Sequence, residues 1–445
     1  MTGSGKKNFQ PPIYLGVAFW GEEFRRSFLD YCMASLLSEG NIPALTNESG
    51  KNRFLIYTTP EDFACMQDHP LLIRLASYMQ VEFSPILFIS EEEFLQKKNP
   101  LGSSKMYHVT RAHAAIVSRM YQDQAVGSVL YPDTIYATHA LDSSYRHIAA
   151  GRTAVLIHFP RLATKKLPEE LARAGYLKEG NPLSIGARPL IKAALQHLHV
   201  DVVAEQWDLP YIGEIFMEVA WPLPKNSGFL FHAFTMWYIF IDYSKLSHHD
   251  TSCLEDNTMD GIYMYRNLKK EEVYFVTDSD ECTAVSFSDH IHRNLVKNQS
   301  TSQKMQWARQ TLRYMSYRQV DAFKLSFSRQ PIFFHAEDLT PECYQIEKKA
   351  KKVVEDILLW KTPNNFFAKL RDFYKEKVIL VRIRLENRLN HLINPIKRVV
   401  KIGFIALFVV IKYVWSFRRK DTDALFCIEE RHDPNLGGHS LRLKK

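Results

Sequence analysis

The chain has 445 residues, of which 46% are hydrophobic and 24% are charged, and its formal net charge is +8. This length and composition predict two or three packed domains, and they exclude both a chain that is disordered throughout and a polytopic membrane protein. The six cysteines form no Cys-x-x-Cys pair, so we expect neither a disulfide scaffold nor a cysteine zinc site, and a reducing compartment is favoured.

The first 160 residues alternate between short apolar runs and helical patterns. The apolar runs predict buried strands at 12–20, 53–57, 81–89, 126–131 and 151–159. Apolar residues at helical spacing predict helices at 22–37, 60–79 and 105–121. Thr59 followed by Pro60 is typical of a helix start. Because strands that alternate with helices form βαβ units, we predict an α/β domain over about 10–160, with a Rossmann-like, mostly parallel sheet.

The remainder of the chain is less regular. Strands are expected at 228–231, 236–241 and 272–276, and helices at 187–198 and 303–325. We divide this remainder into a region that completes the α/β domain, a basic helical segment and a loose tail, at 161–340, 341–420 and 421–445.

Several polar or aromatic residues follow predicted strands, and ligands of open α/β sheets bind at the carboxyl ends of strands. After the first strand, Gly21 permits a close backbone approach and Trp20 can stack on a base; alternatively, the two form a packed Trp beside a turn. After the second strand, the Thr58 hydroxyl can contact a phosphate or a uracil-like edge, or serve only as a helix cap. Lys105 opens the third helix and either meets a diphosphate or is solvated.

Asp133 follows the fourth predicted strand, in the run Tyr131-Pro132-Asp133-Thr134. A carboxylate at the end of a buried strand is costly unless it has a partner. A divalent cation that carries a diphosphate is one such partner, and a backbone turn or an arginine is the alternative. The sequence leaves both open.

These residues carry a resemblance to a known group of proteins. The motifs are a Trp-Gly-Glu-Glu start at 20–23, the run 33–45, a Tyr-Thr-Thr-Pro-Glu-Asp element at 57–62 and a Pro-Asp element at 132–133. Over about residues 12–290 they resemble bacterial glycosyltransferase-like proteins, which implies the nucleotide-sugar-binding fold called glycosyltransferase A. The better-known families carry Asp-x-Asp after strand four. Here Ile135 takes the second Asp position, so dependence on Mg or Mn stays open.

A second acidic cluster, Asp278-Ser279-Asp280-Glu281, follows the strand expected at 272–276. An Asp-x-Asp at a strand end can hold Mg²⁺ or Mn²⁺ between its carboxylates and two phosphates. The same string is also typical of a surface turn. Asp133, Asp278 and Asp280 are therefore the candidate metal ligands, and the second cluster would have to fold back onto the sheet to serve the same site.

None of the 17 histidines has a partner at a two-ligand helical spacing backed by a carboxylate. A single histidine of this kind is typical of a packed or surface position. His113 and His232 are nevertheless candidate catalytic residues together with Asp133, because the resembling proteins have a histidine near both points.

Basic charge is concentrated toward the C-terminal end. Residues 341–445 carry 23 Lys and Arg against 12 Asp and Glu, whereas the first 340 residues carry 34 against 37. Within 397–420, basic residues flank the uncharged run 402–411 and the aromatic run 413–417. This predicts a monotopic anchor on an anionic membrane surface, or a short span over 402–417; a buried helix is the alternative. Nucleic acid is not an expected partner, because the apolar run would make no favourable contact with a phosphate surface.

Together these features predict a membrane-associated glycosyltransferase on the cytoplasmic face, since the polar first residues predict no secretory signal. The donor would be a nucleotide-diphosphate sugar, and the acceptor a lipid-linked or surface-glycan precursor of polysaccharide biosynthesis, with residues 161–340 on the acceptor side. The alternatives are a non-catalytic membrane-bound scaffold with a degenerate fold, and a nucleotidyltransferase. The hypothesis requires Trp20, Thr58 and Asp133 to converge at one crevice.

Overall fold

The chain divides into two compact units, residues 1–358 and residues 359–445. The computed structural model describes residues 11–45, 51–96, 104–212, 218–234, 236–255, 261–289, 296–297, 300–316, 327–358, 428–433 and 438–443. In the second unit the described residues form an antiparallel hairpin, β16 (Ile428–Asp433) and β17 (Gly438–Leu443). The anchor predicted at 397–420 lies outside the described residues. Among the helices that are described, none is both long and apolar enough to cross a membrane.

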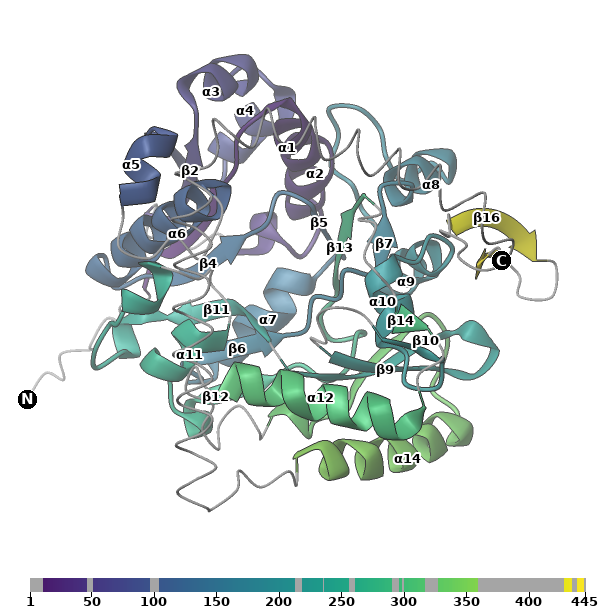
Figure 1. Ribbon diagram of the computed structural model, residues 1–445. Helices are drawn as coiled ribbons and strands as arrows, with labels where there is room; N and C mark the ends of the chain where they lie inside the picture. Colours follow the sequence, from purple (N-terminus) through teal and green to yellow (C-terminus); the bar gives the residue numbers. More distant parts are fainter. Residues whose placement is uncertain are drawn as a thin grey trace, which may run out of the picture. The chain divides into compact units, whose positions relative to one another are not determined.

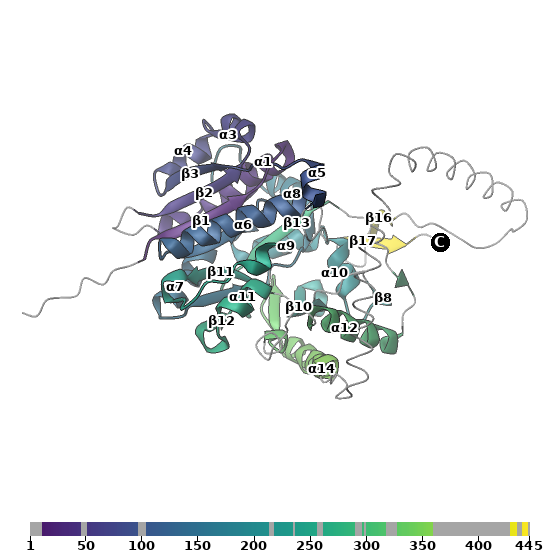
Figure 2. The ribbon, with the colours of Figure 1, turned by 60° about the vertical axis from the view of Figure 1, so that its left-hand side comes forward.

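A seven-stranded, mostly parallel sheet forms the centre of the first unit (Figures 1 and 2). Its strand order is β12-β6-β11-β4-β1-β2-β3. Only β11 runs antiparallel to its neighbours, β4 and β6. The strands are β1 (Ile13–Ala18), β2 (Arg53–Thr58), β3 (Gln80–Pro85), β4 (Val126–Leu130), β6 (Ala154–Ile157), β11 (Trp237–Asp242) and β12 (Val273–Phe275). The protein is therefore a mixed α/β protein, as predicted.

Helices cover both faces of this sheet. On one face, α6 (Ser104–Gln122) lies close to β1, because Gly16 has no side chain where Ile116 approaches. The opposite face of β1 carries Leu15, which is in register with Phe54 of β2. Phe54 in turn contacts Phe28, at 6.1 Å between ring centroids. The sheet is thus buried on both sides at β1, which explains why that strand is a continuous apolar run, whereas the outermost strand β3 is only partly buried.

Two predicted helices differ in detail from the structure. The helix expected at 22–37 is formed by α1 (Glu22–Ser27), a π-helical turn (Phe28–Met33) and α2 (Ala34–Leu36). The helix expected at 60–79 is divided into α3 (Pro60–Met66) and α4 (Pro70–Ala76). Pro70 has no N–H to continue a helix, and the ring of His69 caps the new one by accepting a hydrogen bond from the Leu71 amide at 3.3 Å.

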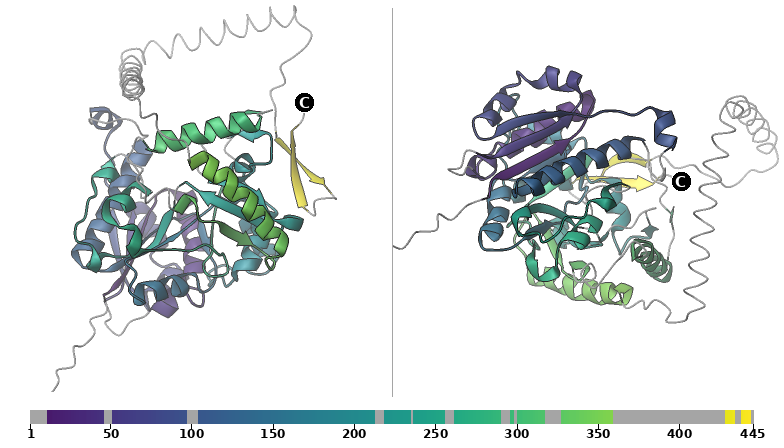
Figure 3. Two further views of the ribbon diagram at one scale, coloured as in Figure 1. Left: turned by 90° about the horizontal axis from the view of Figure 1, so that it is seen from below. Right: turned by 90° about the vertical axis from the view of Figure 1, so that its left-hand side faces the viewer.

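A second, antiparallel sheet has the order β15-β10-β9. Its strands are β9 (Glu218–Pro222), β10 (Gly228–Ala233) and β15 (Ile332–His335). Helices α12 (Thr301–Ser316) and α14 (Pro341–Leu358) lie against it, as Figures 1 and 3 show. Its apolar cluster includes Trp207, Trp221 and Leu230, and is separate from the core around the central sheet.

The remaining described elements connect the two sheets. A ribbon of three short strands has the order β5-β13-β7, with β5 (Thr134–Tyr136), β7 (Ala163–Thr164) and β13 (Ala284–Ser288). The other pair is β8 (Tyr211–Ile212) with β14 (Val296–Lys297). The further helices are α5 (Glu91–Gln96), α7 (Ala140–Ala149), α8 (Leu167–Arg173), α9 (Ala187–Leu195), α10 (Val200–Glu205) and α11 (Gly261–Asn267).

The sheet extends beyond the stretch 10–160 in which it was predicted. β11 inserts between β4 and β6, and β12 pairs with the outer side of β6. Both strands were expected from their apolar runs, but their sheet partners are far away in the sequence and leave no local signal. Of the basic helical segment predicted at 341–420, the described part is α14.

Candidate functional site

The sheet changes direction of winding between β1 and β4. From β1 the chain continues to β2 and β3 on one side, and β4 then pairs with the other side of β1. In open α/β sheets, a ligand binds outside the carboxyl ends of the strands at such a switch point. Gly21 follows the carboxyl end of β1, and Asp133 follows that of β4. The candidate site is therefore at the carboxyl ends of these two central strands.

An aromatic group lies at the end of β1. The ring of Trp20 is 5.3 Å from that of Phe88 and 6.4 Å from that of His108, each in an edge-to-face arrangement. Phe88 is 49% exposed although it belongs to this group. Lys105, in the first turn of α6, has its Nζ 4.3 Å from the ring centroid of Phe24. Trp20 contacts His108 of α6, and Lys105 begins the same helix, so both residues lie at the same end of the sheet.

Gly21 and Thr58 occupy the ends of neighbouring strands. Gly21 has φ +85°, which favours glycine, and its N–H donates to Asp62 Oδ2 at 2.7 Å. Thr59, rather than Thr58, caps α3, since its hydroxyl accepts a hydrogen bond from the Asp62 amide at 3.0 Å. Thr58 is fully buried, and its Oγ1 has no hydrogen-bond partner among the described residues. The cap therefore belongs to Thr59, and a ligand role for Thr58 stays a prediction.

Asp133 is partly exposed and is held by its backbone. Its carbonyl accepts a hydrogen bond from the Phe287 amide of β13 at 3.1 Å. Burial raises the pKa of the Asp133 carboxyl, and the positive charges of Arg161, Lys105 and Lys165 oppose that rise. Basic side chains from three separate parts of the chain therefore lie close enough to act on one carboxylate.

Lys165 is fixed beside Asp133 by the small ribbon. Thr164 is in register with Ser288 of β13, and the Lys165 amide donates to the Ser288 carbonyl at 3.1 Å. The Lys165 ammonium is paired with Asp289 at 2.6 Å and also with Glu23. Helix α1, which follows β1, is thereby connected through Lys165 to the end of β13.

The two predicted catalytic histidines lie in different parts of the fold, His113 on a helix of the central sheet and His232 on a strand of the second sheet. His113, on α6, is buried, and its ring is 5.9 Å from that of Tyr131 at the end of β4. His232, on β10 of the second sheet, is also buried and donates from Nδ1 to the Ser328 carbonyl at 3.0 Å. Burial lowers the pKa of each imidazole to about 4, so both are neutral at pH 7. The structure brings His113 near the end of β4 and leaves His232 apart from it.

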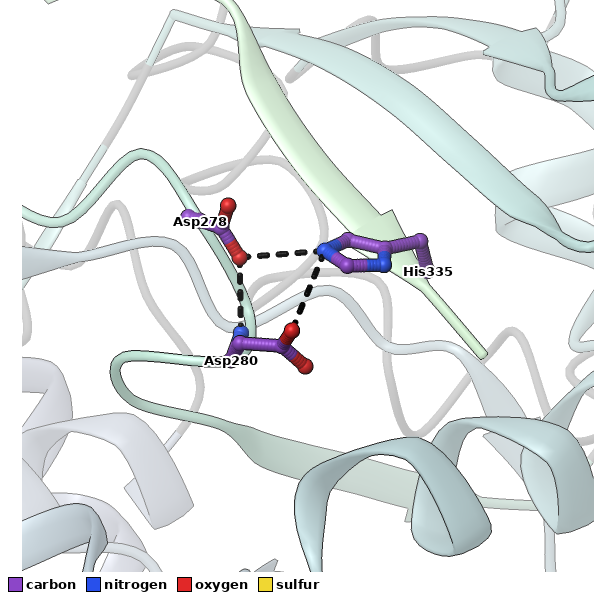
Figure 4. A group of neighbouring side chains, drawn as sticks. All are labelled: Asp278, Asp280 and His335. Atoms are coloured by element: carbon purple, nitrogen blue, oxygen red, sulfur yellow. Dashed lines mark hydrogen bonds and ion pairs between the residues drawn. The ribbon is translucent and has the colours of Figure 1, made fainter. Parts of the chain in front are cut away.

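The second acidic cluster contacts His335, a residue that the sequence analysis did not identify (Figure 4). His335 Nε2 donates to Asp278 Oδ1 at 3.0 Å and lies 4.0 Å from Asp280 Oδ2. His335 Nδ1 donates to the Glu337 carbonyl at 2.7 Å, so both ring nitrogens carry protons. Burial lowers the pKa of His335, but its hydrogen bonds to Asp278 and to the Glu337 carbonyl outweigh burial and raise that pKa above its ordinary value.

The cluster of Asp278, Asp280 and His335 fits a divalent cation. One ligand atom from each residue lies within 4.8 Å of the others, and two carboxylates with an imidazole suit a first-row divalent metal. Binding would displace the proton on His335 Nε2. Arg188 competes for the same oxygens, because its Nε and Nη2 donate to Asp280 at 3.0 Å and 2.7 Å.

The cluster of Asp278, Asp280 and His335 and the residue Asp133 both follow carboxyl ends of strands in the central sheet, but their strands are not neighbours. Asp278 follows β12 and Asp133 follows β4, and β6 and β11 lie between them. Three interstrand spacings amount to about 14 Å. Among the described residues, Asp278 and Asp280 form a group with His335 that could hold a metal ion, and Asp133 is not part of that group.

Some residues at the carboxyl ends of the strands escaped the sequence analysis. Arg161 and Lys165 follow β6 and β7, and the rule that directed attention to Asp133 would have included Arg161. Phe88 follows β3 and could have been found in the same way. His335 could not, because it reaches Asp278 only through the contact of β15 with the segment after β12.

The sequence matches no known protein-family model and no curated protein. Among solved structures, the apo form of mouse xyloside xylosyltransferase 1 is similar over 39% of this chain and 63% of that chain. The two are 12% identical, and the TM-score is 0.25. A score this low does not bear on the activity of the present chain.

Proposed function

We propose that the chain is a glycosyltransferase of the glycosyltransferase-A type, which moves a sugar from a nucleotide-diphosphate donor to a hydroxyl group of a glycan acceptor. One observation carries this proposal. The motifs at 20–23, 57–62 and 132–133, which carry the sequence resemblance, follow three adjacent parallel strands, β1, β2 and β4. These motifs therefore lie at the carboxyl ends of the strands on either side of the switch point between β1 and β4, the part of such a sheet where a ligand binds.

The chemistry of transfer makes three demands on this part of the sheet. The acceptor oxygen forms a bond to the anomeric carbon, and the bond from that carbon to the diphosphate oxygen breaks with its electron pair left on the diphosphate. The hydroxyl proton passes to a base. Trp20 and Phe88 offer aromatic surfaces to the nucleotide, and basic side chains surround Asp133. His113 and His232 remain the candidate bases that the sequence offers; both are neutral at pH 7, a pKa of about 4 makes each a weak base, and His232 lies in the other sheet.

A divalent cation, if it takes part, would be held by Asp278, Asp280 and His335. Bound there, Mg²⁺ or Mn²⁺ would supply Lewis-acid stabilisation to phosphate oxygens within its reach. The remaining features of the proposal come from the sequence. The basic region from 341 onward favours an anionic membrane surface and a lipid-linked or surface-glycan acceptor of polysaccharide biosynthesis, with peripheral or monotopic attachment through 397–420 on the cytoplasmic face.

A donor screen tests the proposal. Nucleotide-sugars added to the full chain, with and without Mn²⁺, should raise the midpoint of thermal unfolding for at least one donor, whereas a non-catalytic scaffold would show no shift. Analysis of the products then separates sugar transfer, which releases a nucleoside diphosphate, from nucleotidyl transfer, which releases pyrophosphate.

The variant Asp133→Ala tests whether Asp133 takes part in catalysis. We expect turnover of the selected donor to fall about 100-fold or more, in the range of losses of an essential catalytic group. The hydrogen bond from Phe287 goes to the Asp133 backbone carbonyl, which alanine keeps, so thermal unfolding should change little. Unchanged turnover would remove Asp133 from the mechanism.

A further inference from the structure

Three basic side chains come together around the segment that holds Asp133. The Asp133 carbonyl and the Lys165 amide are both hydrogen-bonded to β13, at Phe287 and Ser288, and Lys165 and Lys105 both contact α1, through Glu23 and Phe24. Lys105 comes from the first turn of α6, Arg161 from the segment after β6, and Lys165 from the segment after β7. Each position is fixed independently. Lys105 lies over the Phe24 ring, Arg161 is 3.5 Å from Asp201, and the Lys165 backbone is bonded to β13. We call these three residues the cation group.

We propose that the cation group binds the diphosphate of the donor directly, so that donor binding needs no divalent cation at Asp133. The inference rests on the proposed glycosyltransferase function and adds the residues that hold the leaving group. When the bond to the anomeric carbon breaks, its electron pair remains on a diphosphate oxygen. Positioned cations stabilise that additional negative charge without reorganising at the moment of reaction.

The surroundings of Asp133 do not favour a metal ion. The second position of an Asp-x-Asp is taken by Ile135, which is fully buried on β5. Among the described residues, Asp133 belongs to no group of three His, Cys, Asp or Glu side chains that could hold a metal ion, and a divalent cation there would face three positive charges. The residues that do fit a metal follow β12, a strand that lies three strand spacings, about 14 Å, from β4.

The carboxylates now paired with Lys165 do not prevent this binding. Glu23 is 61% exposed and Asp289 is 69% exposed, so both can turn into solvent. Exposed ion pairs contribute little to stability, and a diphosphate carries more charge than either carboxylate. These pairs hold Lys165 in position and compete with the diphosphate. Removing one competing carboxylate should therefore strengthen binding of the diphosphate, which a purely structural role of the pair does not predict.

The inference is tested by calorimetric titration of the full chain with nucleoside diphosphates, namely UDP, GDP, CDP, ADP and dTDP. Each titration is done once in EDTA and once in Mn²⁺. We expect at least one of these nucleotides to bind in EDTA. Lys165→Ala and Arg161→Ala should each weaken it about tenfold, as expected for the loss of a charge-assisted hydrogen bond. Glu23→Gln should strengthen it. Lys269→Ala is the matched control, because Lys269 is an exposed lysine paired with Glu272 at the amino end of β12.

The outcomes separate the two proposals. The proposed role of the cation group is wrong if binding requires Mn²⁺, or if the affinity is unchanged in Lys165→Ala and Arg161→Ala. Either result leaves the glycosyltransferase proposal unaffected. A loss of affinity in Glu23→Gln equal to that in Lys165→Ala also overturns the role of the cation group, since the ion pair would then matter only for structure. Failure of every nucleotide to bind in either condition overturns both proposals.

Discussion

Arg188 and a metal ion would compete for Asp280, so removing Arg188 should raise the affinity for the metal. Arg188 donates to both Asp280 oxygens and, through Nη1, to Asp338 at 2.6 Å. A cation that binds Asp278, Asp280 and His335 must share or displace these hydrogen bonds. We therefore expect Arg188→Gln, which removes a charge near the cluster, to increase the affinity for Mn²⁺.

The size of this increase follows from exposure. The side chains of Arg188 and Asp280 are each 40% exposed, and ion pairs of this kind contribute about 1 kcal/mol or less. Releasing Asp280 should thus strengthen Mn²⁺ binding by up to about fivefold. Asp280→Asn removes one charged ligand and should weaken binding by at least about tenfold, since even the partners of metal ligands are worth about 10–100-fold.

Calorimetric titration of the EDTA-stripped full chain with Mn²⁺ measures both effects. Arg146→Gln is the control, because Arg146 makes an exposed ion pair with Asp142 on α7 and carries the same charge. If Arg188→Gln binds Mn²⁺ no more tightly than Arg146→Gln, Arg188 is not a competitor. If Asp280→Asn binds as the wild type does, the cluster is not the metal site.

Two further predictions concern stability. Burial lowers the pKa of His113 and of His232 to about 4, from an ordinary 6.5. Between these values the unfolded chain binds protons that the folded protein does not, so the free energy of unfolding should fall as the pH drops from 6.5 toward 4, by up to about 3 kcal/mol for each histidine. Urea unfolding at pH 7 and pH 5 should show a smaller loss for His113→Phe than for the wild type; an equal loss would contradict the assignment. For Gly228→Ala, the new Cβ would stand 2.8 Å from the Cα of His335 in the paired strand β15 and would also meet the Phe334 carbonyl. This overpacking should cost about 1–3 kcal/mol in the same assay, and an unchanged value would show that β15 can move away.

The sequence by itself determined the strands of the central sheet and the start of one helix. Apolar runs located the strands of the central sheet, and Thr59 before Pro60 marked the start of α3, with the hydroxyl acting as the cap. These features depend on residues within a few positions of one another, so a local pattern contains them. The rule that ligands bind at carboxyl ends of strands then selected Trp20 and Asp133.

Only the tertiary structure decided which of these residues are neighbours. Lys165 reaches Asp133 because β13 pairs with both β5 and β7, and His335 reaches Asp278 because β15 lies against the segment after β12. His232, chosen from sequence, stands in the other sheet. The physical reason is that strand pairing joins residues that are far apart in the sequence through backbone hydrogen bonds, from 55 positions for Asp278 and Phe333 to 148 for Ala284 and Tyr136. Such bonds depend little on side-chain identity, so the sequence near each residue carries almost no record of its partner.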